Sequence, residues 1–206
     1  EIYTLSLHDA LPIWFSSIFA AESLPPAYPR RAARGTAGSL RAWQAAALKK
    51  YLSAMPQDFL AVATPGAGKT AFALRAATEL LAAGDVHQVT VVCPTEHLKY
   101  QWAEAAARVG IRIDPSYTNS QDALGSRFNG VALTYAQVAA NANLHRARTD
   151  ARRTLVVLDE IHHGGDALSW GEAIREAFTP ARRRLALTGT PFRSDAAAEP
   201  DRKSVV

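Results

Sequence analysis

The sequence predicts an α/β protein built on a doubly wound, mostly parallel sheet. Two observations support this prediction. Short apolar runs alternate with helical segments along the chain, and glycine or polar residues follow directly after the apolar runs. Continuous apolar strands are typical of a parallel sheet that helices cover on both faces. Because ligands bind such sheets at the carboxyl edge of the strands, the residues that follow the strands are expected to form the functional site.

The first half of this alternation begins with a helix. Apolar residues recur at helical spacing over residues 40–51, and Pro56 lies beyond that segment. The apolar run at 59–62 predicts a buried strand that ends in a glycine-rich turn. The Ala- and Leu-rich segment at 71–83 then predicts a helix, with Gly84 as its C-terminal glycine.

Four more strands are predicted after that helix. The β-branched run at 89–93 predicts the second strand of the chain, and a helix is expected over 96–109. Further strands are expected at 131–134, 155–158 and 185–187, with a short helix after the first of these. The alternation from residue 40 onward therefore indicates one doubly wound domain.

The composition restricts the class of protein. Hydrophobic residues make up 48% of the chain and charged residues 20%, which is typical of a folded protein. The single cysteine, Cys93, excludes an intramolecular disulfide and is expected to be buried, and the pair His162–His163 offers too few ligands for zinc. No segment reaches the roughly 18 apolar residues of a membrane span, which favours a cytoplasmic protein without a membrane partner. The high alanine content and the excess of arginine over lysine indicate a GC-rich, bacterial-like coding sequence. The net charge of +4 favours an anionic partner only weakly.

Both ends of the chain are set apart from the domain. Residues 1–13 resemble a sequencing adapter translated in frame, and residues 201–206 resemble the translated reverse complement of the same adapter. Residues 14–39 hold several prolines and a basic run, and they are expected to form a leader whose origin the sequence leaves open. The domain itself is expected over residues 40–200.

A glycine-rich segment at 63–70 predicts a phosphate site. It matches the P-loop pattern except at Ala63, where the strict pattern has glycine. Glycines let backbone N–H groups turn toward phosphate oxygens, the lysine reaches the β- and γ-phosphates, and the threonine hydroxyl binds Mg²⁺. The flanking strand and helix disfavour the alternative of an ordinary turn with a surface lysine. The residues expected to bind the nucleotide here are Thr64, Pro65, Gly66, Ala67, Gly68, Lys69 and Thr70.

Two adjacent carboxylates follow the strand at 155–158. Asp159 is expected to bind Mg²⁺, which prefers hard oxygen ligands. Glu160 is expected to orient and deprotonate an attacking water. A solvated acidic loop is the alternative, and the P-loop upstream disfavours it. A polar coupling role near the γ-phosphate is expected for His162, whereas His163 is equally well explained as a partly buried loop histidine.

These segments together resemble the superfamily-2 helicases, in the branch of the type III restriction subunits and XPB-like proteins. The six segments occur in the order of the family and resemble its upstream L-R-x-W-Q segment (40–44), motif I (63–70), motif Ia (94–102), the next nucleic-acid motif (134–138), the DEAH-type motif II (159–162) and motif III (188–193).

The resemblance implies the first RecA-like lobe of a two-lobed P-loop NTPase, with ATP and Mg²⁺ as cofactors. In that family Gln44 would contact adenine, and the catalytic residues would be Lys69, Asp159, Glu160 and His162. Nucleic acid would be contacted by Thr95, Gln101 and Thr134. The motif III residues would couple ATP hydrolysis to the binding of nucleic acid. They are Thr188, Gly189 and Thr190. Outside these sets, Trp102 is expected to lie in the core rather than stack on a base, and Arg182–Arg184 to form a solvated turn.

The function implied by the resemblance is ATP-dependent translocation on nucleic acid or its unwinding. DNA is favoured over RNA because Ile161 and His162 depart from the DEAD-box form. Two alternatives stay open: the motor subunit of a restriction-type nuclease complex, and a degenerate nucleotide-binding module. The second lobe would supply an arginine finger in cis, so the chain alone is expected to bind ATP with almost no turnover. Polarity, pathway and oligomeric state stay open.

Overall fold

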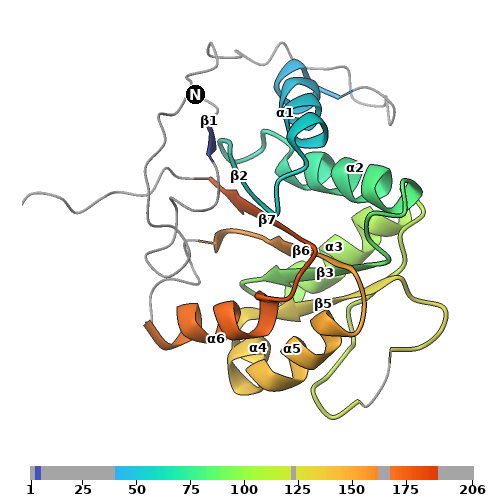
Figure 1. Cartoon of the computed structure of the whole chain (residues 1–206), viewed down its shortest axis with the longest axis vertical. Helices are drawn as coiled ribbons and strands as arrows, with labels where there is room; N and C mark the ends of the chain where they lie inside the picture. Colours follow the sequence, from blue (N-terminus) through green and yellow to red (C-terminus); the bar gives the residue numbers. More distant parts are fainter. Residues whose placement is uncertain (1–2, 6–39, 122–123, 162–167, 190–206) are drawn as a thin grey trace, which may run out of the picture.

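The computed structural model describes residues 3–5, 40–121, 124–161 and 168–189, and within these residues the strands form one seven-stranded sheet (Figure 1). The strands are β1 (Tyr3–Leu5), β2 (Asp58–Val62), β3 (Gln88–Cys93), β4 (Ile113–Asp114), β5 (Gly130–Thr134), β6 (Thr154–Leu158) and β7 (Arg183–Thr188). Their order across the sheet is β1-β2-β7-β6-β3-β5-β4. The six strands from β2 onward are parallel, which confirms the predicted fold class.

The strand β1 lies at one edge and is antiparallel to β2, with Tyr3 opposite Val62. The sequence analysis set residues 1–13 aside and therefore placed no strand there. The expected site residues His162 and Thr190 lie outside the described residues.

Six helices are described, and they cover the two faces of the sheet (Figure 1). They are α1 (Ala42–Ala54), α2 (Lys69–Ala82), α3 (Glu96–Ala107), α4 (Tyr135–Ala140), α5 (Ala142–Asp150) and α6 (Leu168–Phe178). Helices α1 to α3 lie on one face and α4 to α6 on the other. None of these helices combines the length and the apolar composition needed to cross a membrane.

The sheet separates two apolar clusters because successive side chains of a strand point to opposite faces. In β2, Phe59 belongs to the cluster under α1 to α3, and Leu60 belongs to the cluster under α4 and α6. Every residue of β2, β3, β5, β6 and β7 is buried. This double coverage explains why the strands appear in the sequence as unbroken apolar runs.

The structure differs from the predicted elements in a few places. Helix α2 begins at Lys69, two residues before the predicted start, because Gly68 adopts φ +93° and serves as its N-cap. The short strand β4 and the helix α6 were not predicted, and β4 is only 2 residues long, too short to show a periodic pattern. Gly84 ends α2 as predicted: its φ is +67°, and its N–H donates to the carbonyl of Leu81.

The expectation of a solvated turn at Arg182–Arg184 is wrong for two of the three residues. Arg182 is exposed, but Arg183 and Arg184 are buried. The Nη2 atom of Arg184 lies 2.8 Å from Oδ2 of Asp58, and Nε of Arg183 lies 2.9 Å from Oδ2 of Asp85. These carboxylates compensate the guanidinium groups for the water that they lose on burial.

Candidate nucleotide-binding site

The loop between β2 and α2 has the conformation expected of a phosphate-binding turn. Gly66 and Gly68 have φ values of +75° and +93°, in the left-handed region that favours glycine. The N–H of Ala67 donates to the carbonyl of Thr64 over 3.0 Å, which closes the turn. Lys69 follows as the first residue of α2, at the end of the helix where the partial charge is positive.

Lys69 is buried, with 9% of its surface exposed. Its Nζ atom donates to the carbonyl of Ala63 over 3.2 Å and lies 3.0 Å from Oε1 of Glu160. The backbone N–H of Gly189 donates to the other carboxylate oxygen of Glu160 over 3.1 Å. The structure therefore brings together three of the predicted residues, from the start of α2 and from the ends of β6 and β7.

Gly189 occupies the space beside this ion pair. A methyl group added at its Cα would lie 3.2 Å from Nζ of Lys69 and 3.6 Å from Oε2 of Glu160. A contact at the first of these distances forces the neighbour to move. Thr188, the preceding residue, is fully buried as the last residue of β7.

Glu160 has a left-handed backbone, with φ +48°. This conformation costs a residue with a Cβ about 1–2 kcal/mol. Strain of this kind persists only where the surrounding contacts hold it. Here the contacts to Lys69 and Gly189 hold the Glu160 carboxylate between the start of α2 and the end of β7.

Asp159 is buried and hydrogen-bonded on both its side chain and its backbone. The indole Nε1 of Trp102 donates to Oδ2 of Asp159 over 2.8 Å, and the hydroxyl of Tyr135 donates to the Asp159 carbonyl over 2.8 Å. Burial raises the pKa of Asp159 above its usual value, while the hydrogen bond from Trp102 lowers it. Trp102 is 2% exposed, so its expected place in the core is confirmed.

The sequence analysis missed the contact between Trp102 and Asp159. A tryptophan on a helix shows no sign, from its own sequence neighbours, of which polar atom its N–H will reach. The Q-W pair at the end of the motif Ia-like segment is the only signal in the sequence that could have pointed to a special role for this residue.

The start of α1 packs against the P-loop. Gln44 is buried, its Nε2 donates to the carbonyl of Gly68 over 2.8 Å, and its Oε1 accepts from the N–H of Arg41 over 2.7 Å. Nη1 of Arg41 donates to the carbonyl of Gly66 over 2.9 Å, and Nε1 of Trp43 donates to that of Ala67 over 3.1 Å. The structure thus places Gln44 against the P-loop backbone, and its contact with adenine stays a prediction. Arg41 and Trp43 are P-loop contacts that the sequence analysis did not anticipate.

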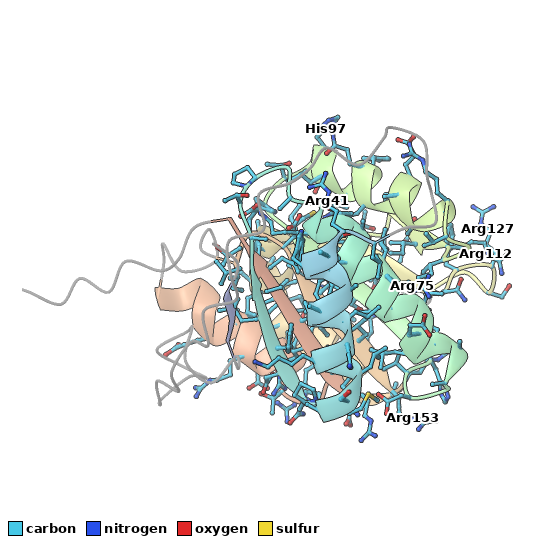
Figure 2. All side chains as sticks on the ribbon, turned by 90° about the horizontal axis from the view of Figure 1, so that it is seen from above. Arg41, Arg75, His97, Arg112, Arg127 and Arg153 are labelled. Atoms are coloured by element: carbon cyan, nitrogen blue, oxygen red, sulfur yellow. The ribbon has the colours of Figure 1, made fainter. Side chains whose placement is uncertain are left out.

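Of the three residues expected to bind nucleic acid, Thr95 and Thr134 cap the starts of α3 and α4, and Gln101 lies in the middle of α3. Thr95 is exposed, and its hydroxyl accepts from the N–H of Leu98 as the N-cap of α3. Gln101 is exposed on the same helix, with Nε2 2.9 Å from Nε2 of His97, which projects from the outer surface of the molecule (Figure 2). Thr134 is buried, and its hydroxyl caps α4 by accepting from the N–H of Gln137 over 3.1 Å.

The residues present fit a nucleotide with a magnesium ion. Lys69 supplies a positive charge at a helix N-terminus, and the partly buried Thr70 and the buried Asp159 supply hard oxygen atoms. In the described part of the chain, no group of three or more His, Cys, Asp and Glu side chains could hold a metal ion by itself. Mg²⁺ in nucleotide sites typically combines one or two protein ligands with phosphates and water.

The doubly wound sheet, the P-loop and the acidic pair define a nucleotide-binding lobe of the superfamily-2 helicase type. Residues 37–193 match the family described as the type III restriction enzyme, res subunit. This match covers most of the chain, and the chain belongs to that family.

Mycobacterial relatives share much of the sequence. The chain is 64% identical over 156 residues to the uncharacterized protein ML1624 of Mycobacterium leprae. It is 65% identical over 156 residues to the uncharacterized protein Rv2917 of Mycobacterium tuberculosis. Each match covers 76% of this chain and 26% of the relative, so the chain spans about a quarter of these proteins.

Several solved structures have a similar fold. The SWI2/SNF2 ATPase core of Sulfolobus solfataricus, solved in complex with dsDNA, has a TM-score of 0.59 and 20% identity, over 74% of this chain and 32% of that one. The type ISP restriction-modification enzyme LlaGI, solved with a DNA substrate mimic, has a TM-score of 0.55 and 16% identity, over 74% and 18%. T4 UvsW has a TM-score of 0.54 and 15% identity, over 72% and 29%. At these identities the likeness shows the fold alone.

Proposed function

We propose that this chain is the ATP-binding lobe of an ATP-dependent DNA helicase or translocase. The observation that carries the proposal is the pair of Lys69 and Glu160, 3.0 Å apart at the carboxyl edge of the sheet. A P-loop lysine and a carboxylate at the end of another strand are the charges that phosphoryl transfer to water requires. We assign the domain to residues 40–200, with a leader at 14–39 and adapter-derived residues at 1–13 and 201–206.

Each residue of the site has a proposed task. The backbone N–H groups of residues 66–70 would bind the phosphates, and Lys69 would exchange Glu160 for a phosphate oxygen. Thr70 and Asp159 would hold Mg²⁺, which when bound neutralises charge on the phosphate oxygens. Glu160, released from Lys69, would accept a proton from the attacking water. His162, Thr188 and Thr190 would transmit the state of the nucleotide to the residues that contact nucleic acid.

DNA is the proposed partner. The expected contacts, Thr95, Gln101 and Thr134, are uncharged, and such side chains position a phosphate backbone without reading its sequence. Two of the structural neighbours were solved with DNA or a DNA mimic. A second RecA-like lobe in the full-length protein would supply the arginine finger. We propose the cytoplasm as the compartment, since ATP and bacterial DNA are both present there.

The family description favours a second candidate, the motor subunit of a restriction-type nuclease complex. The likeness to LlaGI supports the same candidate. The two candidates share this lobe and differ in what the rest of the protein does. A nuclease signature in the remaining three quarters of a full-length relative would favour the second.

The proposed function is tested by phosphate release from a full-length protein that carries this lobe. We expect stimulation by single- or double-stranded DNA, and weaker stimulation by RNA of the same length. DNA cleavage that requires ATP would favour the nuclease-associated alternative. ATP hydrolysis that no nucleic acid stimulates would contradict both.

A further inference from the structure

We infer that Trp102 is a positioning residue that couples nucleic-acid binding to the metal-binding carboxylate of Asp159. This inference rests on the proposed function and names the hydrogen bonds that would connect the nucleic-acid contacts with the metal site. Helices α3 and α4 both begin with a residue expected to contact nucleic acid, and each donates one hydrogen bond to Asp159. The bond from α3 comes from Trp102, and the bond from α4 comes from Tyr135.

The first contact runs through α3. Gln101, expected to contact nucleic acid, is exposed, and the next residue, Trp102, is buried with its Nε1 2.8 Å from Oδ2 of Asp159. Trp102 is 2% exposed and packs in the same apolar cluster as Phe72 and Ile111. Because packed interiors transmit small displacements rather than absorb them, a shift of α3 would move the indole N–H and the carboxylate together.

The second contact runs through α4. Thr134 caps this helix, and Tyr135, its first residue, is buried with its hydroxyl 2.8 Å from the carbonyl of Asp159. The two contacts are also joined to each other. The buried Nζ of Lys99 on α3 donates to Oε1 of Gln137 over 3.0 Å, and the same oxygen accepts from the N–H of Thr134 over 2.9 Å.

The two bonds act on Asp159 in different ways. Tyr135 contacts the carbonyl and so fixes the backbone at the end of β6. Trp102 contacts a carboxylate oxygen and so fixes the rotation of the side chain that would bind the metal. Partners that orient a metal ligand typically change metal affinity by 10- to 100-fold when removed. Trp102 is therefore the contact through which α3 would adjust Mg²⁺ affinity.

The test is a Mg²⁺ titration of nucleotide binding to the full chain, for the wild type and Trp102→Phe. Phenylalanine keeps an aromatic ring and removes the N–H donor. We expect Trp102→Phe to raise the Mg²⁺ concentration at half-maximal effect about tenfold and to leave nucleotide binding in EDTA unchanged. Tyr117→Phe is the control, because it also removes one hydrogen-bond donor from a buried aromatic residue, here a hydroxyl that donates to the carbonyl of Gln121 and not to Asp159.

A second measurement tests the coupling itself. Because coupling between two ligands is reciprocal, Mg²⁺–nucleotide should change the affinity of the wild type for a fluorescent DNA oligonucleotide. In Trp102→Phe we expect this change to disappear while the affinity for DNA without nucleotide stays the same. A variant with an unaltered Mg²⁺ midpoint and unaltered coupling would overturn the inference. A wild type that binds no nucleotide would instead overturn the proposed function.

Discussion

Lys69 and Glu160 form an ion pair beside the end of β7, a strand that neither residue follows in the sequence. The two residues follow β2 and β6, and β7 lies between those strands in the sheet. Gly189, directly after β7, donates its backbone N–H to Glu160, and its lack of a Cβ leaves room beside the pair.

Removal of the P-loop lysine should abolish nucleotide binding or weaken it at least about tenfold. Lys69→Ala deletes a charge-assisted contact with the phosphates, worth on the order of 1.5–3 kcal/mol. Titration with a fluorescent ATP analogue measures the effect. Lys50→Ala, at an exposed position of α1, serves as the control and should bind like the wild type. Equal affinities for Lys69→Ala and the wild type would refute the assignment of the phosphate site.

Substitutions of the two adjacent carboxylates should affect different steps, one the Mg²⁺-dependent binding of the nucleotide and the other its hydrolysis. In a full-length protein that carries this lobe, Glu160→Gln should bind ATP normally and hydrolyse it roughly 10²–10⁴-fold more slowly, because the general base is lost. Asp159→Asn should instead weaken the Mg²⁺ dependence of nucleotide binding. Single-turnover phosphate release and Mg²⁺ titration distinguish the two variants. A wild-type rate for Glu160→Gln would assign the base to another residue.

Two glycine substitutions should differ in severity although both glycines have positive φ. At Gly84 an added Cβ meets nothing within 4 Å, so Gly84→Ala should cost only the conformational strain of about 1–2 kcal/mol. At Gly68 the added Cβ would lie 2.6 Å from Nε2 of Gln44, so Gly68→Ala must also displace the contact between α1 and the P-loop. Urea unfolding and nucleotide titration test this. Similar losses of stability and of binding in both variants would contradict it.

His145 should make the protein less stable as the pH falls below neutrality. Burial lowers the pKa of His145 from 6.5 to about 4, and the nearby Arg148 contributes to the same shift. The unfolded chain therefore binds a proton that the folded chain excludes between these two pH values. In that window the stability falls by about 1.4 kcal/mol per pH unit as the pH decreases.

Urea unfolding of the wild type and His145→Gln over this pH range measures the contribution of His145. The other titrating groups are shared by the two proteins, so the difference in the free energy of unfolding reports His145 alone. We expect the curve of the variant to be flatter below pH 6.5. Parallel curves would show that His145 keeps its ordinary pKa in the folded state.

The parts of the site that local sequence determines could be predicted. Gly66 to Thr70 follow a buried strand and open a helix, and Asp159 and Glu160 follow another strand, so the fold class alone places both at one edge of the sheet. The ranges of the long strands were predictable for the same reason. Each has a continuous apolar run bounded by polar residues.

The contacts that depend on tertiary packing could not be predicted. Trp102 reaches Asp159, and Arg184 reaches Asp58, only because strands distant in the sequence are neighbours in the sheet. The run at Arg182–Arg184 predicts side chains exposed to solvent, because no acidic residue stands near it in the sequence and an unpaired charge is expected in water. Its partners lie about a hundred or more positions upstream, at Asp58 and Asp85. Nothing in the run itself indicates them.

The position of β7 has a consequence for synthesis of the protein. A ribosome releases β2, β3, β5 and β6 before β7, yet β7 is the strand that separates β2 from β6. A nascent chain that stops before Arg183 already contains the P-loop and the acidic pair, without the strand that aligns them. Ligands stabilise only the states that bind them. ATP would therefore begin to stabilise the nascent lobe only after residues 183–188 have emerged from the ribosome.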